Sequence, residues 1–70
     1  MTKYLYLIEK YCEEVSSYDV IAVYPDPKLA LGRAQQECAS ILVWDIKDNV
    51  AEATIPYVFL EIFMAEYIDE

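Results

Sequence analysis

The segment Pro25-Asp26-Pro27 constrains the fold more than any other, because it forces one element to end and another to begin. Proline has no N–H to donate to a strand ladder, so Pro25 ends the short β-branched strand expected over Val20–Tyr24. Aspartate is a preferred N-cap residue, and proline is tolerated at the first helical position. A helix is therefore expected to begin at Pro27 and to run through Ala39.

That helix has an apolar stripe of mostly small residues, which favours close packing against a sheet. The stripe, with spacings of three and four, consists of Ala30, Leu31, Ala34, Cys38 and Ile41. Glycine costs about 1 kcal/mol inside a helix, so Gly32 is expected to mark a tight contact. Cys38 is expected to be a small buried hydrophobe.

The chain before this helix reads as an antiparallel hairpin. The first strand spans Lys3–Cys12, a polar connection follows over Glu13–Asp19, and Val20–Tyr24 is the return strand. Successive side chains of a strand point to opposite faces, so the first strand has an aliphatic and an aromatic side. Leu5 and Leu7 lie on the aliphatic side, whereas the other side holds Tyr4, Tyr6 and Ile8.

A second hairpin is expected after the helix. Ile41–Trp44 reads as a strand, Asp48-Asn49 can form a two-residue turn, and Val50–Ile55 returns. This register places Asp45 opposite Glu52, and like charges directly opposite each other destabilise a sheet. Either the register differs, or the fold tolerates a pair of carboxylates there.

The last stretch, Tyr57–Ile68, alternates with a period of two and predicts a central strand. Its aliphatic side is expected to support the helix, and its other side is aromatic and acidic. The rival interpretation is a helix opened by Pro56, since Leu, Glu, Met and Ala are good helix formers. Apolar residues would then occupy nearly every side of that helix, which favours the strand. The fold predicted is α+β: one domain over residues 1–70, with a small antiparallel sheet in the order β-β-α-β-β-β and one helix on one face.

Composition excludes several kinds of chemistry. The chain has 70 residues, no histidine, a single glycine and two cysteines, Cys12 and Cys38, so His-assisted nucleophilic catalysis, a zinc site and a glycine-rich phosphate loop are not expected. No catalytic residue, metal or cofactor is predicted, and the protein is not expected to be an enzyme. No signal peptide or membrane segment is recognised, so a cytoplasmic protein is expected. A domain this small has a thin core, which favours oligomerisation or partner binding as an additional source of stability.

The net charge of −8 repels nucleic acid and favours basic protein partners, although surface carboxylates also serve solubility. The acidic residues predicted to bind a partner are Glu9, Glu13, Glu14, Asp19, Asp45, Asp48, Glu52, Glu61 and Glu66. The aromatic residues predicted to add contact area are Tyr4, Tyr6, Tyr57, Phe59, Phe63 and Tyr67. Two alternatives stay open for these rings: they form an exposed or dimer-buried patch, or they are core beneath the Trp44 segment.

The opening Lys3-Tyr4-Leu5-Tyr6-Leu7-Ile8-Glu9, the strand ending Val23-Tyr24 and the capped helix Asp26-Pro27-Lys28-Leu29-Ala30 resemble short proteins of phages and prophages. The resemblance covers about the first half of the chain. Small, very acidic phage proteins without catalytic residues also resemble anti-defence proteins, including anti-CRISPR inhibitors. The resemblance implies an inhibitor in the host bacterial cytoplasm that mimics nucleic acid at a basic site, such as that of a CRISPR-Cas subunit. The alternative is a small homodimeric scaffold or accessory module whose aromatic sheet face is the dimer interface.

Overall fold

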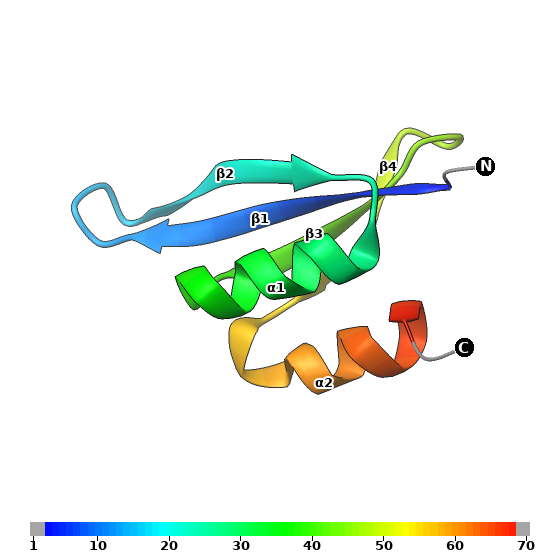
Figure 1. The fold of residues 1–70 in the computed structure, drawn as a ribbon. Helices are drawn as coiled ribbons and strands as arrows, with labels where there is room; N and C mark the ends of the chain where they lie inside the picture. The colour runs from blue at the N-terminus through cyan, green and yellow to red at the C-terminus, as the bar shows by residue number, and fades with distance from the viewer. Residues whose placement is uncertain (1–2, 69–70) are drawn as a thin grey trace.

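The structure, a computed structural model, describes residues 3–68 (Figure 1). The elements, in chain order, are β1 (Tyr4–Cys12), β2 (Ser17–Tyr24), α1 (Pro27–Glu37), β3 (Ser40–Asp45), β4 (Val50–Ile55) and a C-terminal helical segment. That segment comprises a 3-10 turn (Tyr57–Phe59), α2 (Leu60–Phe63) and a π-helical turn (Met64–Ile68). The α+β class is confirmed, as are the antiparallel sheet and the helix between the two hairpins.

The strands form one antiparallel sheet in the order β2-β1-β3-β4. Because Cys12 of β1 pairs with Ser17 and Tyr4 pairs with Asp45, the two hairpin turns lie at opposite ends of β1 (Figure 1). Both outer strands contain a bulge: the register shift against β1 leaves Ile21 of β2 without a partner, and the shift against β3 does so for Glu52 of β4. Edge bulges discourage pairing with strands of other chains.

The β3–β4 hairpin differs from the predicted register. Asp45 pairs with Val50, so residues 46–49 form the connection, and Asn49 takes the left-handed backbone conformation with φ 55°. The Asp45 carboxylate accepts a hydrogen bond of 3.0 Å from the Asp48 N–H, which closes the turn. Because Val50 occupies the position opposite Asp45, Glu52 does not lie there. The pair of facing carboxylates is therefore avoided, as the first of the two alternatives required.

Helix α1 begins as predicted. The Asp26 side chain accepts from the Lys28 N–H at 2.8 Å, and Pro27 is the first helical residue. The helix ends earlier than predicted, at Glu37, because Cys38 is left-handed with φ 52° and the Ala39 N–H donates to the Ala34 carbonyl at 2.9 Å.

Two expectations for this helix are wrong. Cys38 is exposed, because the left-handed cap turns it off the helix axis and away from the apolar stripe. Gly32 makes no tight contact, since a Cβ added there would have no atom within 4 Å. The inward face of α1 is instead formed by Ala30 and Ala34, both with an exposed fraction of 0%.

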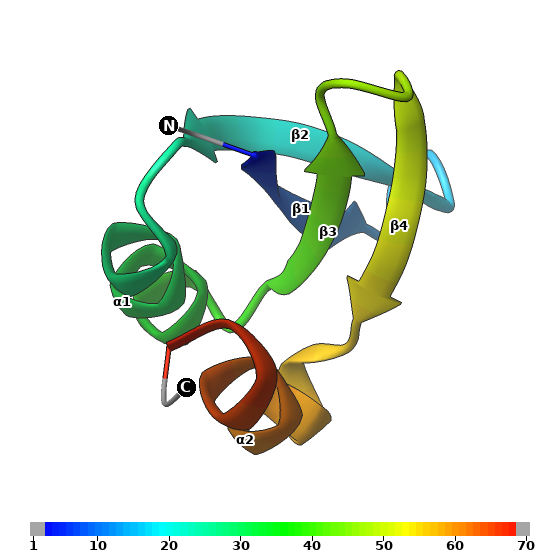
Figure 2. The same ribbon diagram turned by 90° about the vertical axis from the view of Figure 1, so that its right-hand side faces the viewer.

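The prediction of a strand over Tyr57–Ile68 is wrong, and the rival helical interpretation is right. The chain leaves β4 at Pro56 and folds back under the sheet beside α1 (Figure 2). Leu60 and Phe63 are buried, and Tyr67 and Ile68 pack against the core. Apolar residues on the outer side, such as Val58 and Ile62, are exposed. Their presence produced the period-two pattern that indicated a strand.

Both helical segments lie on the same side of the sheet, and no element of residues 3–68 covers the opposite side (Figures 1 and 2). The covered side of β1 is the one that holds Tyr6 and Ile8, with exposed fractions of 6% and 0%. The expectation that the helix rests on the aliphatic side is therefore wrong, because Leu5 and Leu7 point away from both helices. The buried hydrophobic core consists of Tyr6, Ile8, Ala30, Ala34, Ala39, Ile41, Val43, Ile55, Leu60 and Phe63.

Candidate functional site

Four of the six aromatic residues predicted to bind a partner form an aromatic cluster within the molecule: Tyr4, Tyr6, Phe63 and Tyr67. The ring centroids of Tyr6 and Phe63 lie 5.4 Å apart with an edge-to-face angle of 88°, and Phe63 stacks on Tyr67 at 5.1 Å. Tyr4 meets Tyr67 edge-to-face at 5.7 Å. The aromatic side of the sheet is therefore core. It cannot be the interface of the predicted dimer, because α1 and α2 already cover it.

Packing in the aromatic cluster raises the pKa of Tyr67. Burial raises the pKa of Tyr67 to about 12, and the negative charges of Glu52 and Glu66 favour the neutral phenol further. Hydrogen bonding to Glu52 also raises the pKa of Tyr4. Both phenols therefore stay neutral at physiological pH and serve as packing groups.

The remaining two aromatic residues, Tyr57 and Phe59, are exposed on the 3-10 turn before α2. Tyr57 borders a shallow groove between α1 and α2. The groove is lined by Gln35, Tyr57, Val58, Leu60, Glu61 and Met64. Glu61 is its one ionisable carboxylate, so the groove offers contact area and no pair of groups for acid–base chemistry.

The acidic residues predicted to bind a partner do not gather in one place. At the β1–β2 end of the sheet lie Glu13 and Glu14 in the turn, with Glu9 and Asp19 on the adjoining strands. At the other end lie Asp45, Asp48 and Glu52 of the β3–β4 hairpin, and Glu66, whose charge is felt by Tyr67. Glu61 lies apart on α2. Asp45 is only 8% exposed and holds the turn, so it is a structural residue.

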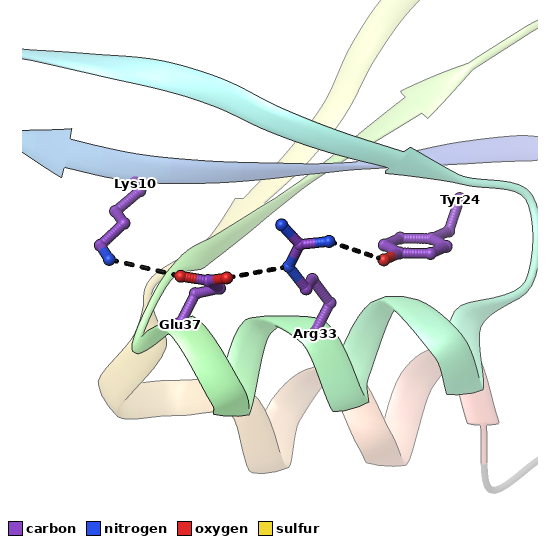
Figure 3. Close-up of polar contacts among 4 residues, drawn as sticks. All are labelled: Lys10, Tyr24, Arg33 and Glu37. Carbon is purple, nitrogen blue, oxygen red and sulfur yellow. Dashed lines mark hydrogen bonds and ion pairs between the residues drawn. The ribbon is translucent and has the colours of Figure 1, made fainter.

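One charged network joins α1 to the first hairpin (Figure 3). Glu37 accepts from Lys10 Nζ at 3.3 Å and from Arg33 Nε at 3.0 Å, and Arg33 also donates to the Tyr24 hydroxyl at 3.1 Å. The hydrogen bond from Lys10, which has the larger effect, and the hydrogen bond from Arg33 both lower the pKa of the Glu37 carboxyl. The sequence prediction missed this network, although the spacing of four between Arg33 and Glu37 on a helix is a signal for such a pair.

Three members of the network, Tyr24, Arg33 and Glu37, line a second shallow groove beside α1, together with Lys28, Leu29, Gly32 and Gln36. Its donors and acceptors satisfy one another, so they hold α1 in place over β1 and β2. Among residues 3–68, no group of three or more Cys, Asp or Glu side chains is arranged to hold a metal ion.

The uncovered side of the sheet is the surface that sequence reasoning did not identify. We call it the open face. Its larger apolar residues are Leu5, Leu7, Val20, Val23, Leu42 and Trp44, and the same side also holds Glu9, Ser40, Ala51 and Thr54. Leu7 of β1 is paired on one side with Val23 and on the other with Leu42. Val20 and Val23 are about half exposed, at 49% and 50%. The signal for it was present, because both β1 and β3 have apolar residues on both of their faces, as strands buried on two sides do.

The open face has acidic residues near its ends and none at its centre. Glu9 lies on the same side of β1, opposite Val20, and Tyr11 and Tyr18 follow with ring centroids 5.1 Å apart. Comparisons of the chain with known protein families, with curated proteins and with solved structures found no match. In the described part of the chain, no helix has the length and apolarity needed to cross a membrane. The open face and the acidic ends are the two surface features that the following proposals use.

Proposed function

We propose that this protein acts by binding, without catalysis, and that its acidic ends occupy a basic surface of another protein that otherwise holds nucleic acid. A subunit of a bacterial defence complex, such as CRISPR-Cas, has a surface of this kind. Carboxylates would stand in the places of phosphates, as the resemblance to small acidic phage proteins implies. The protein would then be an inhibitor that competes with nucleic acid.

The single observation that supports this proposal is how the few basic residues are used. The chain has five lysine and arginine residues against thirteen acids, and two of the five, Lys10 and Arg33, pair with the same carboxylate of Glu37. The acidic residues at the β1–β2 end of the sheet therefore have little compensating charge, whereas Lys3 and Lys47 lie among the acidic residues at the β3–β4 end. A strongly negative surface of this kind attracts basic partners over distances of about 10 Å at ordinary salt.

The two acidic ends are separated along the longest dimension of the molecule, which is 38 Å (Figure 1). Phosphates along duplex DNA are spread over similar lengths, with about one negative charge per 1.7 Å of helix axis. Asp45 is not among the contributors, because its carboxylate is buried in the β3–β4 turn. The contributors that remain at the ends are Glu9, Glu13, Glu14, Asp19, Asp48, Glu52 and Glu66.

Displacement of nucleic acid tests the proposal. Purified CRISPR-Cas complexes loaded with fluorescently labelled target DNA would be titrated with the protein, and anisotropy would report release of the DNA. We expect release at low salt that weakens as salt is raised, because charged contacts are screened. A protein that releases DNA from none of the complexes at about 50 mM salt would contradict the proposal.

A matched pair of variants separates a local effect of the carboxylates from that of net charge. Glu13→Gln with Glu14→Gln raises the net charge by two at the β1–β2 turn. Gln35→Lys with Gln36→Lys makes the same change at exposed positions of α1. We expect the first pair to weaken displacement about tenfold or more and the second to weaken it less. Equal losses would mean that only the overall charge matters.

A further inference from the structure

The open face raises a question that the acidic ends do not answer, namely what covers it. We propose that two copies of this protein associate through their open faces, sheet against sheet, about a two-fold axis. This inference goes beyond the proposed function and does not depend on it. A symmetric dimer is the commonest assembly of soluble proteins, and its interface has to be self-complementary.

The chemistry of the face suits such an interface. Its centre is apolar, with Leu7 between Val23 and Leu42, and Trp44 paired with Leu5. Antiparallel sheets with one face in water normally show polar residues on that face. Here the alternation is lost, because the residues that point away from the helices are as apolar as those that point towards them.

The area is near the lower bound for a specific dimer. The strands have nine, eight, six and six residues. A rise of about 3.3 Å and a strand spacing of about 4.8 Å give each residue about 16 Å², and hence roughly 460 Å² in plan for one face. Two faces together, with the relief of their side chains, reach about 1,000 Å², where weak but specific interfaces begin. A dimer with micromolar affinity is expected.

The relief of the face is also suited to a second copy. Large side chains stand on the two central strands, with Leu5 and Leu7 on β1 and Trp44 on β3, whereas the adjoining edge strand β4 presents the smaller Ala51 and Thr54, the pairing partners of Trp44 and Leu42. In a symmetric dimer, the large side chains on β1 and β3 of each copy can pack over the small side chains on β4 of the other copy. Packed sheets lie about 10 Å apart, which leaves room for one layer of interdigitated side chains.

The net charge of the protein limits which other partners could cover the open face. A net charge of −8 opposes nucleic acid and anionic membranes as partners of this face. Glu9 lies towards the β1–β2 end, and the other end carboxylates lie in turns or at the margins, so a second copy can cover the apolar centre while these groups stay in water. The same charge makes two copies repel, so added salt should strengthen the dimer.

Sedimentation equilibrium of the protein alone tests the proposal, at loadings from about 1 to 500 μM and at about 50 and 500 mM NaCl. We expect a monomer–dimer equilibrium whose dissociation constant falls several-fold at the higher salt. The chain has one tryptophan, so the emission of Trp44 should shift to the blue as the dimer forms. A monomer at every loading in high salt would overturn the proposal.

Matched variants place the interface on the sheet. Leu7→Lys introduces a charge at the centre of the open face, and Val58→Lys makes the same change on the 3-10 turn before α2, where the side chain is 68% exposed. We expect Leu7→Lys to weaken the dimer at least tenfold and Val58→Lys to leave it unchanged. Val23→Lys, on the edge strand and half exposed, repeats the test if Leu7→Lys does not fold. A dimer that survives the sheet variants, or is lost in Val58→Lys, would contradict the open-face arrangement.

Failure of this proposal and failure of the proposed function look different. The dimer needs no partner and strengthens with salt, whereas displacement of nucleic acid needs a basic partner and weakens with salt. A monomeric protein that releases DNA would therefore overturn only the dimer. A dimeric protein that releases no DNA would overturn only the inhibitor.

Discussion

The two faces of β1 have nearly the same hydrophobicity, but one face is buried under the helices and the other is partly exposed. Tyr6 and Ile8 point towards the helices and are buried, whereas their neighbours Leu5 and Leu7 point away and remain partly exposed. Hydrophobicity alone therefore did not decide which face became the core. What differs is the shape of the residues that each face presents to α1 and α2.

The small inward residues of α1 explain the choice. Ala30 and Ala34 let the helix lie close to the sheet, and the space beside this narrow contact is filled by the rings of Tyr6, Phe63 and Tyr67. Interiors are close-packed, so a helix lined by alanine needs large partners next to it. The aromatic side of β1 supplies these partners, and the aliphatic side does not.

The largest effect is expected from Phe63→Ala, which removes a ring with an exposed fraction of 0% from the centre of the aromatic cluster. Truncation of a buried phenylalanine costs about 3–5 kcal/mol, so the free energy of unfolding measured with urea should fall by that amount. In a domain of this size, such a loss leaves little or no cooperative transition. Phe59→Ala is the control, because its ring is 49% exposed and lies outside the cluster. A similar loss for both variants would contradict the core that we describe.

Neighbouring residues of β1 compare the two faces directly. Ile8→Ala should lower the free energy of unfolding by about 2–4 kcal/mol, since the side chain is fully buried. Leu7→Ala should cost about 1 kcal/mol or less when measured at low concentration and low salt, where the monomer predominates. The difference between the variants measures how unequal the faces are. Equal costs would show that something already covers the open face in the monomer.

The stability of the protein at alkaline pH tests whether Tyr67 is buried on the covered face. An unfolded tyrosine has a pKa near 10, and burial raises the pKa of Tyr67 to about 12. Stability from the neutral phenol is fully present below pH 10 and is lost as pH rises towards about 12, because the unfolded chain releases the proton first. Tyr67→Phe should reduce this alkaline loss by about 1–2 kcal/mol, as followed by urea unfolding at several pH values. An unchanged alkaline profile would contradict the burial of the hydroxyl.

The smallest effect is expected from Gly32→Ala, and it is a gain. Since a Cβ at this position meets nothing within 4 Å, alanine adds helix propensity without a clash. The free energy of unfolding should rise by about 0.5–1 kcal/mol. A loss would mean that Gly32 does make the tight contact with the sheet that its position in the helix first indicated.

Much of the fold could be predicted because local chemistry specified it. The cap at Asp26, the start of α1 at Pro27 and the return strand Val50–Ile55 are confirmed, and so is the β1–β2 hairpin, although β2 begins at Ser17 and not at Val20, because residues 17–19 pair with the end of β1. The candidate site was harder to predict. The aromatic residues were identified together, and Tyr6 and Phe63 do meet, but inside the molecule, where they are core. The open face was missed because its leucines were assigned to the core.

The sequence by itself determined where β2 ends and where α1 begins, since Pro25, Asp26 and Pro27 act within a few positions of themselves. Tertiary structure decided two things that no local pattern contained. It made Tyr57–Ile68 helical, because Leu60, Phe63 and Tyr67 are spaced to meet the core from one side of a helix. It also determined which face of the sheet the helices cover. Both faces are apolar and only one layer of helices is present, so the volume of the packed side chains distinguished the two faces.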